Sequence, residues 1–416
     1  MIHWLTESLG TSSRESVKEK TLALVDVRDL VDGPGNSNEV LLDKINSVTE
    51  LLKQNKRVVI CCDYGLSRSN AIAVGALMNH YGHDFDSAVS LVAEKTESKA
   101  IRVDLLGSVR RALKPNEKNT ARTKDRSILV TGGTGFIGRI LVSSLSQNYC
   151  VVMPSRSELD LAENAIGLDR LVRESGVNTV VHLANPRVYT TTQSMGQTII
   201  ILKNLLDVAK ENNLDIVYLS GWVVYSGYFS PVIASESLPL RPKGTYGATK
   251  ALCENLVTQY REVYGLSVTM IRLSAVYGIG SDKPRFIHTF LDKALRNEPI
   301  FTHNYLNGLP VLDLLHVRDA ARAIKCAIDM RSAQSQDFNI GSGRVHSTLE
   351  IANLIRELCG SSSVIREHDV NDYTSNVTMN TTKAKELLRW QPTIDLRTGL
   401  AEIVHSKREA NTTERQ

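Results

Sequence analysis

The stretch Ser127-Ile-Leu-Val-Thr-Gly-Gly-Thr-Gly-Phe-Ile-Gly138 determines the fold of most of this chain. An apolar run that suits a buried strand is followed by a glycine-rich turn and then by the start of a helix. Gly132 allows the tight turn, Gly135 lets the backbone approach a pyrophosphate, and Gly138 lets helix and strand pack closely. The phosphates would lie at the positive end of the helix. We therefore predict a dinucleotide site formed by Gly132, Thr134, Gly135, Phe136, Ile137 and Gly138.

Beyond this turn, short apolar runs alternate with amphipathic stretches that suit helices. The expected strands are Ser127–Thr131, Tyr149–Pro154, Val177–Leu183, Asp215–Ser220 and Ser267–Leu273. Mostly apolar strands separated by helices indicate a parallel sheet that helices cover on both faces. The predicted fold class is α/β, with a doubly wound Rossmann sheet.

Tyr246 and Lys250 stand in the segment GTYGATK, at the start of a predicted helix over Tyr246–Tyr260. A spacing of four residues puts both side chains on one face of that helix. The ammonium group of Lys250, together with a nearby nicotinamide cation, would lower the pKa of the Tyr246 phenol. Tyr246 could then exchange a proton with a substrate hydroxyl while a hydride moves to or from the nicotinamide. We predict that these two residues form a catalytic pair.

With these motifs in this order, residues 127–405 resemble the extended short-chain dehydrogenase/reductase family. Further matching segments are HLAN (His182–Asn185), RLSAVYGIG (Arg272–Gly280), DLLHVRD (Asp313–Asp319), FNIGSG (Phe338–Gly343) and LLRWQP (Leu387–Pro392). The resemblance implies a smaller C-terminal substrate-binding subdomain, NAD or NADP as cofactor, and an epimerase or reductase acting on a sugar nucleotide or a related sugar. It adds four residues to the cofactor site: Asp160, Leu161, Leu183 and Ala184. Dimers that form through the helices flanking the tyrosine are common in the family, so a homodimer is one alternative here.

Three positions depart from the family pattern. The family usually has Ser or Thr four residues before the Tyr of a VYG segment, where this chain has Gly221. Ser220 is the nearest hydroxyl candidate, but strand alternation would turn it to the other face unless the backbone is bulged. Trp222 and Val223 replace the acid and base of members that dehydrate the sugar, which argues against a 4,6-dehydratase. Leu312 replaces an arginine that commonly contacts the substrate diphosphate, which argues against the usual pose of a nucleotide diphosphate.

The choice between the two dinucleotides depends on the end of the second strand, VVMPSRSELDL. An aspartate there would accept the ribose hydroxyls of NAD and repel a 2′-phosphate. The chain instead has Pro154, Ser155 and Arg156. A guanidinium can pair with a phosphate, so NADP is slightly favoured over NAD, with a solvated surface arginine as the competing interpretation.

A second motif, Val58-Val-Ile-Cys-Cys62-Asp-Tyr-Gly-Leu-Ser-Arg68-Ser69, also runs from strand to loop to helix. Backbone N–H groups of such a loop can cradle an anion, and the same positive field would make Cys62 a thiolate nucleophile. Arg68 could hold two phosphate oxygens and Ser69 could hydrogen-bond the leaving thiolate. The spacing C-x5-R resembles the cysteine-dependent dual-specificity phosphatases. This resemblance implies phosphate contacts from Asp63, Tyr64, Gly65, Leu66, Ser67 and Arg68.

Such a phosphatase also needs a general acid to protonate the leaving oxygen. Asp32, in the segment DGPGN, resembles the residue on the acid loop of that family, and Asp29 and Asp26 are the alternatives. Cys61 stands where the family usually has His. A buried structural cysteine and a phosphate-binding module without turnover remain as other interpretations.

Composition and length complete the expected organisation. The chain has 416 residues, 42% of them hydrophobic, and a net charge of +4, which gives no basis for nucleic-acid binding. Neither a signal peptide nor an apolar run long enough for a membrane span is visible, and six irregularly spaced cysteines suggest no zinc site or disulfide framework. We expect a cytoplasmic protein without a metal. The expected parts are a small α/β phosphatase-like domain (1–114), a linker (115–126), the reductase domain (127–405) and a frayed tail (406–416).

The preferred functional hypothesis is a bifunctional enzyme. A cysteine-dependent phosphatase acting on a phosphorylated substrate would be joined to an NAD(P)-dependent sugar epimerase or reductase. In the first alternative, the phosphatase is the main catalyst and acts on a phosphoprotein or a sugar phosphate. In the second alternative, Gly221 and Leu312 mark a reductase domain that only senses a dinucleotide.

Overall fold

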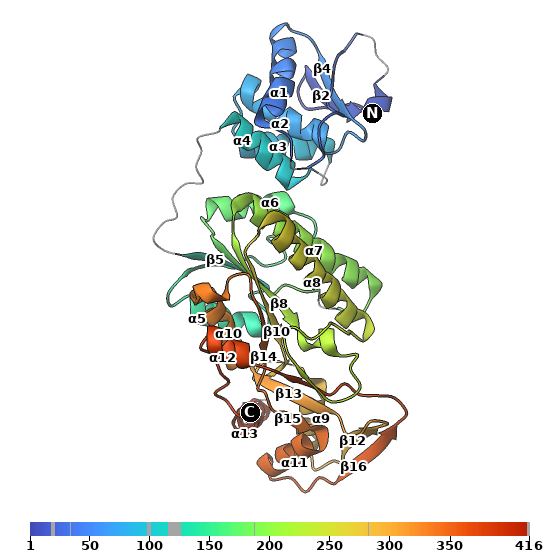
Figure 1. Cartoon of the computed structure of the whole chain (residues 1–416), viewed down its shortest axis with the longest axis vertical. Coiled ribbons are helices and arrows are strands. Elements are labelled where there is room, and N and C mark those ends of the chain that lie inside the picture. The colour runs from blue at the N-terminus through green and yellow to red at the C-terminus, as the bar shows by residue number, and fades with distance from the viewer. Residues whose placement is uncertain are drawn as a thin grey trace. The chain divides into compact units, whose positions relative to one another are not determined.

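The structure is a computed structural model that describes residues 1–17, 21–33, 35–97, 101–114, 126–186, 188–281 and 283–413. It divides into two compact units. The first contains the N-terminal sheet and its helices, together with Leu159–Glu174 and Asn204–Asn213. The second contains the large sheet and the C-terminal elements (Figure 1).

The first unit is built on a four-stranded sheet in the order β1-β2-β4-β3. Strands β2, β4 and β3 are parallel, and β1 is antiparallel to β2. The elements are β1 (His3–Trp4), β2 (Leu9–Ser13), β3 (Ala23–Asp26), α1 (Asn38–Lys53), β4 (Val58–Cys62), α2 (Arg68–Tyr81), α3 (Phe85–Thr96) and α4 (Val103–Leu113). Strand β4 is buried along its whole length, so the loop that follows it starts from a rigid base.

The second unit contains a six-stranded parallel sheet in the order β14-β10-β8-β7-β5-β6. Its strands are β5 (Ser127–Thr131), β6 (Cys150–Val152), β7 (Thr179–His182), β8 (Asp215–Gly221), β10 (Val268–Leu273) and β14 (Asp337–Ile340). Five of them confirm the predicted strands to within two residues at each end. The sixth, β14, was not predicted as a strand, because its four residues include the polar pair Asp337 and Asn339.

Helices cover both faces of this sheet. Helices α5 (Phe136–Leu145) and α10 (Val317–Asp329) pack together on one face. There they share a core with Val217 and Leu219 of β8. Helix α8 (Gly244–Tyr264) lies on the other face, because its Lys250 contacts Tyr218, which alternation turns away from Val217 and Leu219. In the chain, helix α6 (Ala165–Glu174) lies between β6 and β7, and helix α7 (Thr192–Asn212) lies between β7 and β8.

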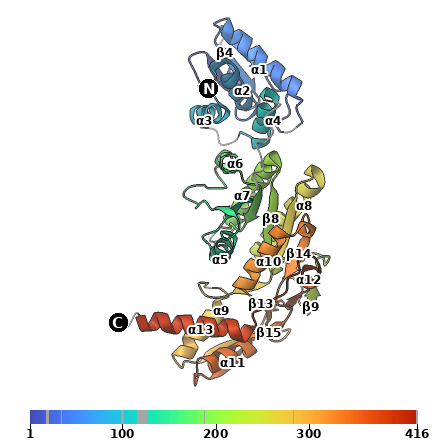
Figure 2. The ribbon, with the colours of Figure 1, turned by 90° about the vertical axis from the view of Figure 1, so that its left-hand side faces the viewer.

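Smaller sheets and helices follow the Rossmann core toward the C-terminus. The sheets are ordered β11-β13-β15, β12-β16 and β17-β9. Their elements are β9 (Val232–Ala234), β11 (Ala275–Tyr277), α9 (Arg285–Leu295), β12 (Ile300–Tyr305), β13 (Val311–His316), β15 (Val345–Ser347), α11 (Thr348–Leu358), β16 (Ile365–Val370), β17 (Val377–Met379), α12 (Thr382–Leu387) and α13 (Leu396–Thr413). Helices α9, α11 and α13 pack around one core, and Figure 2 shows them beside one another.

The predicted tail and linker have different outcomes. Residues 406–413 continue helix α13, so the expected frayed end is wrong over that range. The helix is anchored there because Arg408 donates to the carbonyl of Cys359 at 2.8 Å. Residues 115–125 of the predicted linker and 414–416 of the predicted tail lie outside the described residues. In the described part of the chain, no helix is long and apolar enough to cross a membrane.

Candidate active site

The predicted glycine turn lies where the order of the strands in the large sheet reverses. Strand β5 has β6 on one side and β7 on the other, so a crevice for a ligand is expected beyond the carboxyl ends of β5 and β7. Gly132 follows β5 with a φ of +73°, a conformation that favours glycine. A Cβ atom at Gly132 would lie 2.7 Å from the backbone nitrogen of Ala184. The structure therefore brings together Gly132, Leu183 and Ala184, three residues that were predicted separately.

The start of helix α5 offers donors to this crevice. Gly135 is the N-cap residue and provides no side-chain cap, and Phe136 and Ile137 form the first turn. At Gly138 a Cβ atom would lie 2.4 Å from the carbonyl oxygen of Gly132, so the loop could not close with any larger residue there. These positions fit the pyrophosphate of a dinucleotide, whose charge the uncapped helix end would stabilise.

The predicted adenine-side residues are held by local hydrogen bonds. Arg156 is exposed in the turn that follows β6. Asp160 accepts from the backbone N–H of Ala162 at 2.9 Å, and the carbonyl of Leu161 accepts from Asn204 Nδ2 at 2.8 Å. Their contacts with a dinucleotide stay predictions.

The predicted catalytic pair lies on the first two turns of α8. Lys250 is buried, and its Nζ donates to the carbonyl oxygen of Leu219 in β8 at 2.9 Å. Tyr246 is half-buried and packs against the ring of Tyr189, with the ring centres 4.6 Å apart. The Nζ of Lys283 lies 4.1 Å from the centre of the Tyr189 ring, so a second cation stands beside the phenol.

The electrostatics of the phenol differ from the expectation. Burial, and to a lesser extent the neighbouring Tyr189, raise the pKa of Tyr246 to about 12, although the positive charge of Lys283 opposes them. The expected cation, Lys250, is occupied by the carbonyl of Leu219, and burial lowers its own pKa. In the chain alone, therefore, Lys283 and not Lys250 is the cation that favours the phenolate.

Two other polar side chains line the same strand ends. Burial lowers the pKa of His182 to about 3, and its Nδ1 lies 2.7 Å from the hydroxyl of Thr131. This neutral histidine ties β7 to β5. Ser220 is buried, and its hydroxyl has no hydrogen-bond partner among the described residues, so it is not bonded to Tyr246. At Gly221 a Cβ atom would meet no atom closer than 3.5 Å, which leaves room above the end of β8.

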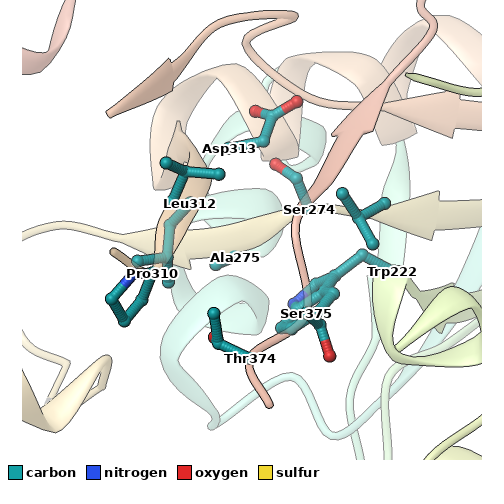
Figure 3. Close-up of a pocket in the computed structure, with 10 residues that line it drawn as sticks. Trp222, Ser274, Ala275, Pro310, Leu312, Asp313, Thr374 and Ser375 are labelled. Atoms are coloured by element: carbon teal, nitrogen blue, oxygen red, sulfur yellow. The ribbon is translucent and has the colours of Figure 1, made fainter. Parts of the chain in front are cut away.

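A cavity of about 150 Å³ opens beside these strand ends. Figure 3 shows Trp222 and Leu312, two of the positions that depart from the family pattern, on opposite sides of it. Trp222 belongs to the short helix η2 (Trp222–Tyr225), which follows β8 directly and contacts the start of α8. The lining residues are Trp222, Ser274, Ala275, Pro310, Val311, Leu312, Asp313, Thr374, Ser375 and Val377.

Comparison with known proteins identifies a family for the part of the chain that contains the large sheet. The family model described as "NAD dependent epimerase/dehydratase family" matches residues 128–341. The chain belongs to this family. This confirms the predicted Rossmann fold with its parallel sheet.

Individual relatives are similar over the same part of the chain. A putative UDP-glucose 4-epimerase of Methanocaldococcus jannaschii is 28% identical over 316 residues, which is 69% of this chain and the whole of that protein. The structure of a UDP-glucose 4-epimerase from Thermotoga maritima with UDP-glucose has a TM-score of 0.60 and 25% identity, covering 68% of this chain and 99% of that one. A UDP-N-acetylglucosamine 4-epimerase from Bacillus cereus has a TM-score of 0.57 and 28% identity, covering 68% and 97%.

The loop after β4, outside the residues that the epimerase family model matches, surrounds a buried thiol. The Sγ of Cys62 accepts from the backbone N–H of Gly65 at 3.2 Å and lies 3.4 Å from the hydroxyl of Ser69. Burial opposes ionisation, but hydrogen bonds from Ser69, Gly65 and Tyr64 outweigh it and lower the pKa of the Cys62 thiol. Gly65 has a φ of +72°, and a Cβ atom there would lie 2.5 Å from the backbone of Ser12. The neighbouring Cys61 is different, because burial raises its pKa to about 11.

Arg68 is held on the rim of this loop. Its Nη1 donates to the carbonyl oxygens of Arg28 at 2.9 Å and Leu30 at 3.3 Å, and its Nη2 donates to the carboxylate of Asp63. Asp63 was predicted only to contribute to the phosphate cradle, whereas its side chain here binds the predicted clamp. Burial opposes the Arg68 charge, but the Asp63 hydrogen bond and the charges of Asp63, Cys62 and Asp32 outweigh it and raise the pKa of the guanidinium.

The alternatives for the general acid are separated by their partners. Asp26 forms an ion pair with Arg28 at 2.7 Å, whose hydrogen bonds lower the pKa of the Asp26 carboxyl despite partial burial. Asp29 pairs with Lys44 at 2.8 Å. Asp32 is exposed on the same loop and is close enough for its charge to act on Arg68. Of the three, Asp32 remains the best candidate for the acid.

Sequence reasoning missed several residues of both sites. Tyr189 and Lys283 come from loops far from Tyr246 in the chain, and neither belongs to a periodic pattern. Ser274, which lines the cavity, appeared only within the RLSAVYGIG motif. Asp319, another motif residue, is structural, because it accepts from the backbone N–H groups of Thr393 and Ile394 at 2.9 Å. In the described part of the chain, no group of His, Cys, Asp and Glu side chains could hold a metal ion.

Proposed function

We propose that the second unit is an NAD(P)-dependent epimerase or reductase of a sugar nucleotide or a related sugar. The observation that carries this proposal is the placement of Tyr246 and Lys250 on one face of α8, with Lys250 bonded to β8 at 2.9 Å. Both residues therefore stand beside the carboxyl ends of the strands, where a doubly wound sheet binds its ligands. Family membership and the similarity to sugar-nucleotide epimerases support the same substrate class.

The chain's own residues have distinct roles in this proposal. Gly132, Gly135 and Gly138 would hold the pyrophosphate, and the nicotinamide, when bound, would supply or accept the hydride. The hydroxyl of Tyr246 would exchange a proton with the substrate hydroxyl at the carbon that is oxidised or reduced. Because the pKa of Tyr246 is about 12 in the chain alone, the phenolate needs additional positive charge, which Lys283, Lys250 and an oxidised nicotinamide would supply.

The cofactor choice within this proposal is between two related dinucleotides. The description of the family names NAD. The exposed Arg156 after β6 supports NADP, because its guanidinium could pair with the 2′-phosphate. A titration of the full chain with each dinucleotide distinguishes them.

The test is a screen of sugar nucleotides and sugars with NAD or NADP added, read by liquid chromatography that separates epimers of equal mass, followed by mass spectrometry. The wild-type chain should convert at least one compound, and Tyr246→Phe should lower its rate by about 10²–10⁴, the usual contribution of an acid–base group. Tyr264→Phe, a partly exposed tyrosine on the same helix, is the matched control and should keep the rate. If Tyr246→Phe retains more than about a tenth of the wild-type rate, the proton route is wrong.

We infer a second activity for the first unit, a cysteine-dependent phosphatase working through a phosphocysteine. The lowered pKa of Cys62, with Ser69 and Gly65 donating to its Sγ, supports a nucleophilic thiolate. Cys62 would attack phosphorus and release the alcohol, which Asp32 protonates, and water would then hydrolyse the phosphocysteine with Ser69 stabilising the departing thiolate. Joined to the epimerase unit, this makes the chain a bifunctional enzyme.

Hydrolysis of an aryl phosphate by the full chain tests this activity. Cys62→Ser should abolish turnover while Cys61→Ser, the neighbouring cysteine with the raised pKa, should retain it. Arg68→Ala should lose both binding and turnover, because it removes a charged donor from the rim. Equal rates for wild type and Cys62→Ser would reduce this unit to a phosphate-binding module.

One alternative keeps the phosphatase as the main activity and makes the second unit a dinucleotide sensor. The absence of a hydroxyl at Gly221 and of a cation at Leu312 favours it. It predicts dinucleotide binding without conversion of any sugar, and a change in aryl phosphate hydrolysis when the dinucleotide is added.

A further inference from the structure

The described lining of the cavity beside the strand ends of the second unit carries no positive charge. None of its described lining residues is a lysine or arginine, and most of the lining is apolar. Its one ionisable lining group is Asp313, which is buried. The carboxylate of Asp313 accepts from the backbone N–H of Ser342 at 2.7 Å, from the Ser342 hydroxyl at 2.8 Å, and from Met379 at 3.0 Å. These donors favour the carboxylate, whereas burial, the larger effect, raises the pKa of Asp313. The described cavity wall therefore offers a ligand no positive charge.

A phosphate in this cavity would be unfavourable. It would leave water for a mostly apolar lining that has no cation to pair with it among the described residues. Leu312 is the residue that makes the difference, since Figure 3 places its side chain at the wall of the cavity. Its aliphatic side chain offers a phosphate no donor at all.

The cavity does contain one free hydrogen-bonding group. The hydroxyl of Ser274 is buried, with 4% of the residue exposed, and has no hydrogen-bond partner among the described residues. A buried hydroxyl without a partner is costly, so its retention points to a ligand atom that completes the bond. On the opposite margin, Trp222 offers an aromatic ring that can pack against the apolar face of a small ring.

The cavity is also in reach of the proposed chemistry. Ser274 follows β10 and Trp222 follows β8, and these strands are neighbours whose last residues, Leu273 and Gly221, are paired. The helix η2 that begins with Trp222 contacts the start of α8, where Tyr246 lies. A volume of about 150 Å³ suits one six-membered ring, since a cavity of that size holds one benzene molecule.

We propose that this cavity binds an uncharged, hydroxyl-bearing six-membered ring of the substrate, with a hydrogen bond to Ser274 and contact with Trp222, and that no phosphate enters it. This deepens the proposed epimerase or reductase function and rests on it. The substrate class is a sugar or glycoside whose neutral ring fills the cavity. Unlike in the usual diphosphate pose implied by the family resemblance, no charged group of the substrate would lie beside Leu312.

A binding measurement that does not depend on turnover tests the phosphate exclusion. The chain has three tryptophans, Trp4, Trp222 and Trp390, so the fluorescence difference between wild type and Trp222→Phe isolates the cavity. Inorganic pyrophosphate is the probe. The full wild-type chain should show no saturable Trp222 signal with it. Leu312→Arg should bind pyrophosphate with a saturable Trp222 signal, and wild type should show none at concentrations at least about tenfold higher.

Leu312→Lys is a second charged variant in case the arginine disturbs folding, and Leu312→Met is the neutral control that should behave as wild type. Circular dichroism identifies any variant that has not folded. A saturable Trp222 signal from pyrophosphate in the wild-type chain would overturn the proposal. A lack of binding in both folded, charged variants would also overturn it, because Leu312 would then not control the charge of the cavity.

The neutral ring is tested with matched probes: methyl hexosides, the corresponding hexose 1-phosphates and the UDP-hexoses. Wild type should bind at least one methyl hexoside with a Trp222 signal, and Ser274→Ala should weaken that binding severalfold. Tighter Trp222-linked binding of the phosphorylated compounds would overturn the proposal. These readings are independent of hydride transfer. If neutral sugars bind but none is converted, the proposed function is wrong and the cavity inference stands. If UDP-hexoses are converted and bind in the cavity more tightly, the cavity inference is wrong and the proposed function stands.

Discussion

Replacing Gly132 by alanine should separate two effects of a glycine that the structure distinguishes. Gly132 and Gly176 belong to the same unit and both have positive φ, +73° and +58°. An alanine in either place must adopt the left-handed conformation, at a cost of about 1–2 kcal/mol. At Gly176 a Cβ atom would meet nothing within 4 Å, whereas at Gly132 it would lie 2.7 Å from the backbone nitrogen of Ala184. The second contact adds an overpacking cost of about 1–3 kcal/mol.

The two variants should therefore differ in a predictable way. Gly132→Ala should lower the free energy of unfolding by about 2–5 kcal/mol in all. Part of this cost arises because the alanine pushes the Ala184 segment into the crevice that would hold the dinucleotide. Calorimetric titration of the full chain with NAD and with NADP should show affinity reduced at least about tenfold for Gly132→Ala. Gly176→Ala should keep wild-type affinity despite its own backbone strain. Equal affinities for the two variants would refute the placement of the dinucleotide beside Gly132 and Ala184.

The remaining predictions concern the cofactor preference and the cysteine loop. Arg156→Ala should weaken NADP binding by about 1–3 kcal/mol and leave NAD binding unchanged. Equal losses of binding free energy for NADP and NAD would show that Arg156 has a structural role. Asp63→Asn should lower the inhibition constant of inorganic phosphate up to about fivefold, because it frees Arg68 from a partly exposed ion pair. An unchanged inhibition constant would show that breaking this ion pair costs phosphate binding no free energy. Alkylation by iodoacetamide, read by peptide mass spectrometry across a pH series, should reach Cys62 at much lower pH than Cys61. The pKa of Cys62 is lowered, so its thiolate is already present where Cys61, with a pKa of about 11, is still protonated. Reversed order would contradict the proposed nucleophile.

The sequence predicted the large sheet well because its strands are buried on both faces. Ser127–Thr131 matches β5 residue for residue, since five consecutive residues that must all be buried leave a clear apolar run. The glycine turn was equally visible, because Gly132 and Gly138 are required by backbone atoms that would lie within 2.7 Å of a Cβ atom there. By contrast, β14 carries polar residues at alternate positions that bond neighbouring elements, as Asn339 does with the carbonyl of Ala234 at 2.8 Å. Such a short strand lacks the continuous apolar run that marks β5.

The electrostatics of both sites could not be predicted from local sequence. The cation that acts on Tyr246 is Lys283, which the fold brings in from a distant loop. The carboxylate that binds Arg68 is Asp63, whose direction depends on how the loop backbone turns. Motifs predicted candidate residues for each site, but the distances and partners that set each pKa depend on the folded chain.

The most direct test of the central claim is single-turnover absorbance of reduced nicotinamide. Wild-type chain is mixed with NAD or NADP and with each compound that the mass-spectrometric screen finds to be converted, and the near-ultraviolet band is followed in a stopped-flow instrument. We predict that the band appears with the wild-type chain and that Tyr246→Phe, with dinucleotide affinity near wild type, slows its appearance by about 10²–10⁴. Unchanged kinetics in Tyr246→Phe, or conversion of the compound without any reduced nicotinamide, would contradict the assignment of this unit as an enzyme that uses Tyr246 for proton transfer.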